Sequence, residues 1–333
     1  MFILDNDYLY PFLMVLGSLS RVTDSEVRIF LINIEKWKDS EQLINKENLM
    51  IAKNLSELIG LELNIIDLDL GEDFNPSQLT TYGHISQTAW VKVFALFSKT
   101  GYDFNDFVYI DPDTLPLPGF LEIFSTSGSS KSGFQARPTS GHSSFENRWE
   151  HQRQKSLKVS QESENSEWYF NSGVMKIDLS KWNNYKFWVD WQLVFDNLDE
   201  YRIQIVDQDL LNLVILGDYT PLPVSFNTYP AEYQEGVSKL IHYAGGLKPW
   251  HFRSPLSRVK LDHSTKQAIK EWHLNEALTW DTVLKSGNTD LYLSIKKLKK
   301  KSDRGFLFAL SQLFPKIAQS RLVQSRLLKY LKR

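Results

Sequence analysis

The sequence of 333 residues predicts an α/β protein built on a doubly wound sheet. Short apolar segments with the composition of buried strands occur at residues 2–4, 27–34, 61–68 and 107–110. Longer segments with helical spacing of their apolar residues lie between them. Strands that alternate with helices in this way form sheets whose ligands bind beyond the carboxyl ends of the strands.

The first predicted helices fill the intervals between these strands, at residues 8–18, 40–59 and 85–97. Residues 125–166 are rich in Ser, Gly, Gln and charged residues, which indicates loops around one strand at 134–136. Regular structure is expected again over residues 168–177, followed by helices over 179–195 and 207–214. The helix over 179–195 carries an aromatic stripe that we interpret as core, formed by Trp188, Trp191 and Phe195.

The composition excludes several classes of protein. With 42% hydrophobic residues, the chain has enough apolar mass to outweigh the entropy of ordering, which excludes a disordered protein. It contains no cysteine, so thiolate catalysis and thiolate metal sites are excluded and Asp, Glu and His remain as metal ligands. The apolar run from Tyr8 to Leu16 contains Pro11 and is about half of the ~20 residues that cross a bilayer. We therefore expect neither a transmembrane span nor a signal peptide.

Charge is distributed unevenly along the chain, although the net charge is only −2. Residues 296–333 carry 12 Lys and Arg residues against one acidic residue, whereas residues 1–295 carry 26 basic and 39 acidic residues. Basic residues interleaved with Phe and Leu favour a helix that lies on an anionic membrane surface, here at the cytoplasmic, inner face of the membrane. The alternative is a helix that packs on the acidic body. Because that body repels phosphate, we expect no nucleic-acid partner.

The Asp-x-Asp spacing occurs four times, at residues 5/7, 67/69, 111/113 and 207/209. Residues i and i+2 of an extended chain point to the same side, so two such carboxylates can share one divalent ion. Asp111 and Asp113 follow the apolar strand at 107–110 and are separated by a stiffening proline. Asp5 follows the first strand, so these acids are expected in one crevice. The pair at 67/69 ends an ordinary strand and is interpreted as solvated surface.

His242 is the candidate third metal ligand. A metal ion that bridges a diphosphate needs few protein ligands, because phosphate oxygens complete its coordination. Two carboxylates with one imidazole suit Mn²⁺ better than Mg²⁺, since nitrogen ligation favours the later metal. Gly245 and Gly246 follow and allow the backbone to approach phosphate, and Lys248 can neutralise it.

In this order the motifs resemble glycosyltransferase family 8, the group that contains glycogenin and the bacterial lipopolysaccharide galactosyl- and glucosyltransferases. The resemblance covers most of residues 1–250. The segment Val108 to Asp113 is similar to the metal-binding Asp-x-Asp strand of the family, and Phe170 to Val174 is similar to its Phe-Asn-x-Gly segment. Asp207-Gln208-Asp209 resembles its Asp-Gln-Asp helix start, and His242 to Trp250 resembles its His-x-x-Gly-x-x-Lys-Pro-Trp signature.

The resemblance implies a GT-A fold, which is Rossmann-like with a mixed central sheet flanked by helices, followed here by a basic helical tail. It implies a retaining glycosyltransferase that moves a hexose, galactose or glucose, from a UDP-sugar to a glycan or lipid-linked saccharide acceptor. The implied cofactor is Mn²⁺, with Mg²⁺ as the alternative. Residues 1–275 are then the catalytic domain, and residues 276–333 are a helical, basic, amphipathic segment for membrane association.

The resemblance also implies a role for each motif residue. Metal ligation is implied for Asp111, Asp113 and His242. Catalysis or contact with the donor sugar is implied for Asn171, Asp207 and Gln208, and retention uses either a side-chain nucleophile or attack on the same face as the leaving phosphate. Binding of the donor is implied for Asp5 and Tyr8 at the uracil, for Lys92, and for Gly245 and Lys248 at the diphosphate.

One departure from the family pattern leaves an alternative open. Many such enzymes present an arginine near residue 90, whereas this chain has Trp90, with Lys92 two residues later as a possible source of the same charge. The alternative is therefore a non-catalytic member of the family that binds a UDP-sugar or glycan. A nucleotidylyltransferase on a similar sheet is disfavoured, because it requires a basic, Gly-rich N-terminal loop where this chain has Asp5-Asn6-Asp7-Tyr8.

Overall fold

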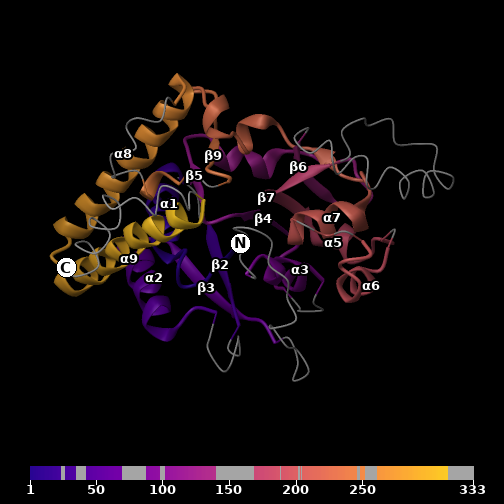
Figure 1. Ribbon diagram of the computed structural model, residues 1–333, viewed down its shortest axis with the longest axis horizontal. Helices are drawn as coiled ribbons and strands as arrows, with labels where there is room; N and C mark the ends of the chain where they lie inside the picture. The colour runs from indigo at the N-terminus through magenta and orange to yellow at the C-terminus, as the bar shows by residue number, and fades with distance from the viewer. Residues whose placement is uncertain are drawn as a thin grey trace.

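The computed structural model describes most of the chain (Figure 1). The described residues are 1–23, 27–34, 43–69, 88–97, 102–139, 169–187, 189–201, 203, 205–245, 248–251 and 261–313, the last eleven as backbone only. The loop region expected at 125–166 is therefore described only as far as residue 139. Parts of the expected helices at 40–59 and 85–97, Trp188 and the last twenty residues lie outside the described residues.

The first 67 residues form a parallel sheet whose strands are connected by helices. The strands are β1 (Phe2–Ile3), β2 (Arg28–Asn33) and β3 (Glu62–Asp67), hydrogen-bonded in that order. Helix α1 (Leu9–Val22) follows the first strand and α2 (Lys46–Leu58) follows the second. The side chain of Asn45 caps α2 by accepting a hydrogen bond from the backbone of Asn48. The predicted alternation of strands and helices is confirmed here.

The sheet continues as a second set of strands in which both directions occur. Its order is β4 (Asp106–Ile110), β7 (Phe170–Asp178), β6 (Phe134–Pro138) and β8 (Thr220–Pro221). Strand β7 is antiparallel to both of its neighbours, whereas β6 and β8 are parallel. A backbone hydrogen bond of 3.2 Å from Ile110 N to Met1 O brings β4 beside β1. The mixed sheet that was expected is confirmed.

A two-stranded ribbon lies at the end of this sheet and was not predicted. It consists of β5 (Thr114–Pro116) and β9 (Leu240–His242), which are antiparallel, with Thr114 paired to His242. Short 3₁₀ helices connect the surrounding elements, at Phe120–Ser125, Val224–Phe226, Pro230–Glu232 and Pro249–His251. The ribbon matters because it joins the segment after β4 to the segment around the histidine.

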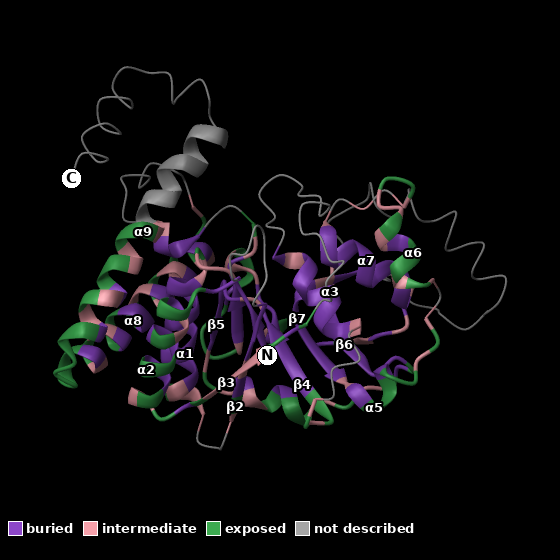
Figure 2. Cartoon of the chain, turned by 90° about the horizontal axis from the view of Figure 1, so that it is seen from below, coloured by how far each residue is buried: buried purple, intermediate pink, exposed green. Residues whose placement is uncertain are grey.

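Two groups of helices flank the strands (Figure 1). On one side α1 contacts both α8 (His263–Lys285) and α9 (Thr289–Leu313), and α2 contacts α9. On the other side α3 (Ala89–Phe97) contacts α7 (Val206–Ile215), which in turn packs on α6 (Trp191–Asp196) and β7. Figure 2 shows that the central strands are largely buried, while exposed residues lie on the outer faces of the helices. Among the described helices, each is too short or too polar to cross a bilayer.

The prediction of a single helix over residues 179–195 was wrong. The chain forms two short helices, α5 (Leu179–Trp182) and α6, with non-helical residues between them. Each helix has its own N-cap, because Asp178 accepts hydrogen bonds from the backbone of Ser180 and Lys181, and Asp190 accepts one from Gln192. Capping aspartates at both positions start a new helix where aromatic spacing alone indicated a continuous one.

The part of the basic tail that is described packs on the body of the protein. Just before the tail, Leu291 and Ile295 of α9 are buried, and within the tail Lys299 is 2.6 Å from the buried carboxylate of Glu276 on α8. The packing alternative therefore holds for the side chains of α9 up to residue 302. Helix α8 runs through residues 275 and 276, where the division into two segments was predicted. That division stays a prediction.

Candidate active site

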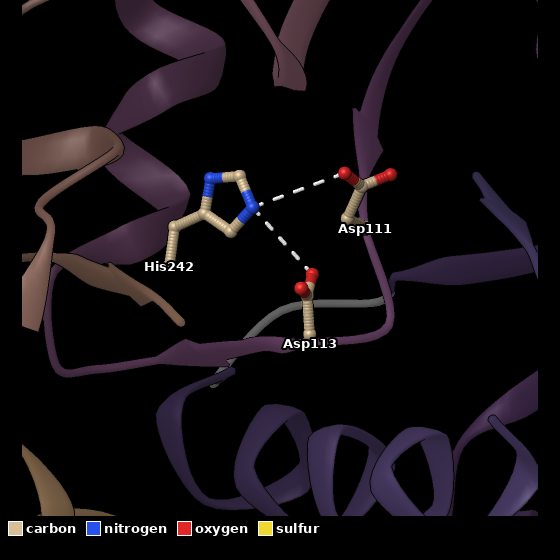
Figure 3. Close-up of side chains that lie close together, drawn as sticks. All are labelled: Asp111, Asp113 and His242. Carbon is tan, nitrogen blue, oxygen red and sulfur yellow. Dashed lines mark ion pairs between the residues drawn. The ribbon is translucent and has the colours of Figure 1, made fainter. Parts of the chain in front are cut away.

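The predicted acids and histidine meet because two segments after strand ends are joined by the β5–β9 ribbon. Asp111 directly follows β4, and its backbone N–H donates a hydrogen bond of 2.8 Å to Gly173 O on β7. Asp113 directly precedes β5, and its backbone carbonyl accepts a hydrogen bond of 2.9 Å from Tyr243 N, beside the end of β9. These backbone bonds place the carboxylates of Asp111 and Asp113 next to each other, both facing Nε2 of His242 (Figure 3).

The three side chains form a cluster in which each presents one ligand atom. Nε2 of His242 lies 3.5 Å from Oδ1 of Asp113 and 3.8 Å from Oδ2 of Asp111. One ligand atom from each of the three lies within 4.8 Å of the others, and this is the only such cluster of His, Asp and Glu among the described residues. Oxygen and imidazole ligands at these separations suit a divalent cation.

Two further observations fit the cluster to a metal ion. Oδ1 of Asp113 is buried and has no hydrogen-bond partner among the described residues, which is costly for a carboxylate oxygen unless a cation binds there. Gly173 closes the cluster from β7, and a Cβ atom at this position would lie 2.1 Å from Cε1 of His242 and 2.8 Å from Oδ2 of Asp111. The missing side chain of Gly173 therefore leaves the space between the ligands open.

Two buried lysines neutralise the acids from opposite sides. Nζ of Lys92 on α3 lies 3.2 Å from Oδ1 of Asp111 and 2.7 Å from Oδ2 of Asp207 on α7. Nζ of Lys248 lies 2.5 Å from Oδ2 of Asp113 and also donates a hydrogen bond to the backbone carbonyl of Tyr243. Burial opposes the charge of both ammonium groups, but the neighbouring carboxylates outweigh it, so the pKa of each lysine is raised.

The two carboxylates respond to their surroundings in opposite directions. Burial raises the pKa of Asp111, and the charge of Lys92 only partly offsets it. Burial acts in the same sense on Asp113, but Lys248 and His242 outweigh it and hold the pKa of this carboxyl below its usual range. Asp113 is therefore the more strongly ionised member of the pair, and its unpartnered oxygen faces the histidine.

The residues expected at the uracil, Asp5 and Tyr8, follow β1 in the chain and line the same pocket. Asp5 accepts hydrogen bonds from the backbone of Asp7 and Tyr8, and Oγ1 of Thr88 donates to its other oxygen at 2.8 Å. The ring of Tyr8 meets that of Trp250 edge-on at 6.2 Å, and burial raises the pKa of its hydroxyl to about 12. The tyrosine is thus a neutral, aromatic wall of the pocket.

The residues expected at the donor sugar form a hydrogen-bonded group between β7 and α7. Nδ2 of Asn171 donates to Oε1 of Gln208 at 3.0 Å, and Oγ of Ser172 donates to Oδ2 of Asp207 at 2.7 Å. Gly245 adopts a φ of 83°, and no atom of the described residues lies within 4 Å of where its Cβ would be, which leaves room for a ligand beside the backbone. The structure brings all eleven predicted site residues to the wall of one pocket.

Trp90 does not take the place of the expected arginine. Its side chain is buried in the core, with its ring edge-on to Phe195 at 5.2 Å, whereas Lys92 lies at the wall of the pocket. Residues two apart on a helix do not share a face, so the two side chains of α3 point to different environments. The cationic position in the pocket is occupied by the lysine.

Sequence reasoning missed two residues that hold the site together. Tyr109 donates a hydrogen bond of 2.6 Å from its hydroxyl to Oδ1 of Asp111, and its ring lies 4.4 Å from Nζ of Lys92. The alternation of β4 was a usable signal, because it places Tyr109 and Asp111 on the same side. Asn227 contacts both His242 and Asn171, and nothing in its local sequence indicates this.

Comparison with solved structures identifies the fold. The galactosyltransferase LgtC, solved in complex with donor and acceptor sugar analogues, superposes with a TM-score of 0.57 at 18% identity, over 81% of this chain and 93% of that one. The bifunctional glycosyltransferase WbbM superposes with a TM-score of 0.52 at 16% identity, over 89% of this chain and 50% of that one. The fold is therefore that of a GT-A glycosyltransferase.

Sequence comparison then identifies the family. The sequence model described as glycosyl transferase family 8 matches residues 1–254, and the chain belongs to this family of glycosyltransferases. A lipopolysaccharide 1,2-glucosyltransferase of Escherichia coli is 35% identical over 98 residues, and that of strain K12 is 33% identical over 100 residues. These matches cover 25% of this chain and less than a third of either relative, 29% and 28%. The predicted family resemblance is confirmed.

Proposed function

We propose that this glycosyltransferase moves a hexose, galactose or glucose, from a UDP-sugar to a glycan or lipid-linked saccharide, with retention of configuration and with the help of a divalent ion. The observation that carries this proposal is the cluster of Asp111, Asp113 and His242, with a buried carboxylate oxygen that lacks a partner and a glycine that leaves the centre open. The roles proposed below for the predicted residues rest on their positions around this cluster.

The proposed ligands of the ion are the facing atoms of Asp111, Asp113 and His242. Mn²⁺ is the proposed ion and Mg²⁺ the alternative, because one ligand is an imidazole nitrogen. When bound, the ion stabilises the negative charge that develops on the leaving UDP.

The two lysines are proposed to bind the diphosphate. In the structure the ammonium group of Lys92 is paired with Asp111, and that of Lys248 is paired with Asp113. Both carboxylates belong to the proposed ligand set. With an ion bound to the cluster, these carboxylates would be shared with it, and the two lysines would be available to phosphate oxygens in the same pocket. Lys248 keeps its bond to the carbonyl of Tyr243 and is thus held at the pocket wall while its anionic partner changes. Gly245 is proposed to bring the backbone near the same phosphates.

Asn171, Asp207 and Gln208 are proposed to hold the donor sugar. Oε1 of Gln208 accepts hydrogen bonds from both Asn171 and the backbone of Ser172, and Oδ2 of Asp207 contacts both Ser172 and Lys92. Because these oxygens are already engaged, we favour attack by the acceptor on the face of the leaving phosphate over a nucleophile from the protein.

The binding site of the uracil base and the chemical class of the acceptor are proposed on separate grounds. Tyr8 supplies a ring face to the uracil, and Asp5 accepts a hydrogen bond from its N3–H group. A lipid-linked saccharide acceptor is supported by the names of the E. coli relatives, which act on lipopolysaccharide. We further propose that the basic end of the chain holds the protein on the anionic, cytoplasmic face of the membrane, where such an acceptor is found.

A panel of UDP-sugars tests the proposal, with release of UDP as the measurement, with and without Mn²⁺ and with an excess of chelator. We expect release from UDP-galactose or UDP-glucose in the presence of metal, and binding of UDP that is clearly tighter than binding of ADP or GDP. Equal binding of the three nucleotides would contradict the uracil site. Tight binding of UDP-sugars without any turnover, even with added acceptor lipids, would favour the non-catalytic alternative.

A further inference from the structure

Two backbone N–H groups fix the orientation of the side-chain amides beside the proposed metal site. The N–H of Gly173 donates to Oδ1 of Asn171 at 3.0 Å, and the N–H of Ser172 donates to Oε1 of Gln208 at 3.2 Å. A backbone N–H can only donate, so each of these amides must turn its oxygen toward the strand. The resulting hydrogen bond from Nδ2 of Asn171 to Oε1 of Gln208 is consistent with both assignments.

The fixed orientation of the Asn171 amide also determines the orientation of the Asn227 amide. Its side chain lies 2.9 Å from Oδ1 of Asn171, which is an acceptor, so the group of Asn227 at this contact is the donor Nδ2. The oxygen of Asn227 is therefore directed to its other contact, Nδ1 of His242, at 2.9 Å. Asn227 is fully buried, so its carbonyl oxygen and this ring nitrogen are matched to each other rather than to bulk water.

An amide oxygen accepts only, so Nδ1 of His242 carries a proton. In its neutral form the imidazole therefore has its lone pair on Nε2, which is the nitrogen that faces Asp111 and Asp113. We propose that Asn227 is a positioning residue that selects this tautomer of His242 for metal ligation and, through its other end, aligns Asn171 at the donor-sugar position. The metal part of this inference rests on the proposed function, whereas the tautomer does not.

Asn227 is itself held in place from the opposite side. Nη1 of Arg137 on β6 donates a hydrogen bond of 2.6 Å to the backbone carbonyl of Asn227. The guanidinium makes two further hydrogen bonds of 2.8 Å to Glu232 and lies 4.1 Å from the ring of Tyr229. Arg137 thus fixes the backbone from which the amide reaches both partners. Such outer partners orient a ligating histidine and set which of its nitrogens binds the ion.

Three variants of the full chain separate the two contacts. Asn227→Leu removes both, and Asn227→Asp keeps an acceptor for Nδ1 but cannot donate to Asn171. Asn275→Leu is the matched control, because Asn275 is a buried amide that donates to the carbonyl of Met14, and neither residue lines the pocket. Thermal unfolding checks that each variant folds. The first measurement is the tautomer of His242 without metal, from long-range ¹H–¹⁵N correlations of the imidazole, assigned by the loss of its signals in His242→Gln.

We expect protonated Nδ1 in the unsubstituted protein, in Asn227→Asp and in the control, and a mixture of tautomers in Asn227→Leu. Calorimetric titration with Mn²⁺ alone is the second measurement, and affinity should fall ~10–100-fold in Asn227→Leu and stay unchanged in Asn227→Asp. Asn227→Asp should still raise KM for the UDP-sugar. A proton on Nε2 in the unsubstituted protein, or an unchanged tautomer in Asn227→Leu, would overturn the inference. Absence of Mn²⁺ binding in the unsubstituted protein would instead overturn the metal-dependent function, and the tautomer would still be decided.

Discussion

At the scale of single residues, the proposed metal site depends on the absence of a side chain at Gly173. A methyl group there would lie 2.1 Å from the imidazole and 2.8 Å from a carboxylate, and both distances are shorter than van der Waals contact allows. We predict that Gly173→Ala folds but loses affinity for Mn²⁺ by ~100-fold, because the ligands are pushed from a common centre. Calorimetric titration measures this, with Gly128→Ala as a control glycine remote from the cluster. Unchanged affinity would show that the ion binds elsewhere.

The ligand residues themselves give a second prediction at this scale. Asp111→Ala, Asp113→Ala and His242→Ala should each abolish transfer and metal-dependent binding of UDP, with losses beyond the ~10–100-fold typical of an outer partner. The measurements are release of UDP and binding of UDP at limiting Mn²⁺. Asp69→Ala is the matched control, because Asp69 belongs to an Asp-x-Asp spacing on the surface. Wild-type turnover of His242→Ala at limiting metal would remove the histidine from the ligand set.

At the scale of elements, three helices are joined by one buried carboxylate. Glu276 of α8 accepts hydrogen bonds from the hydroxyl of Tyr10 on α1 and from Lys299 on α9, and lies 3.3 Å from Nδ1 of His273. Burial raises the pKa of Glu276, but its hydrogen-bond partners lower it more, from 4.5 to about 2. The first described turns of the basic tail are therefore attached to the body by an ionised group.

This depressed pKa has a consequence for stability. A carboxyl whose pKa is lower in the folded state stabilises that state above its unfolded pKa, and this contribution is lost as pH falls toward the folded pKa. Glu276 should thus contribute about 3 kcal/mol at neutral pH, decreasing between about pH 5 and pH 2. Urea unfolding of the unsubstituted protein and Glu276→Gln should show a difference that shrinks over this range. The exposed Glu57→Gln serves as control, and a pH-independent difference would refute the ionised state.

At the scale of the whole molecule, the acidic body and the basic end of the chain have different partners. Lysines of α9 lie close to acids of the body, with Lys301 2.9 Å from Asp7 and Lys299 2.6 Å from the buried carboxylate of Glu276. These pairs account for part of the tail only, because residues 303–333 hold seven further Lys and Arg residues against one acid. Each basic residue near an anionic surface contributes ~1 kcal/mol, so this segment is sufficient for docking on a membrane at low salt.

We predict that the full chain sediments with phosphatidylglycerol vesicles at low salt, and that a variant ending at Ser302 does not. Ending there keeps the packed part of α9, including Ile295 and Lys299, so that the body stays intact. The shortened variant should bind UDP as the full chain does, and salt should release the full chain, because exposed charges are screened. Equal sedimentation of both, or of neither, would leave the tail without a membrane role.

Much of the site was predictable because its parts are local. Asp111 and Asp113 follow an apolar strand at a spacing that puts both carboxylates on one side, and a ligand crevice forms where such strands end. Most helices and the alternation of strands with helices follow in the same way from the period of apolar residues, whereas the mixed sheet was expected only from the resemblance to the family. The prediction of a single helix over 179–195 was wrong because two aspartates cap separate helices. The aromatic spacing favours one continuous helix and the caps favour two, and the sequence alone does not show which of these local preferences prevails.

Tertiary structure alone decided which distant groups are partners. The sequence by itself determined the family, the order of the motifs and the residue types at the pocket. Only the folded chain shows that Lys92 pairs with Asp207 and that Trp90 lies in the core. It also shows that Asn227 lies between His242 and Asn171. The physical reason is that periodicity records which face of an element is buried, whereas a hydrogen bond or ion pair depends on positions within a few tenths of an ångström across elements far apart in the chain.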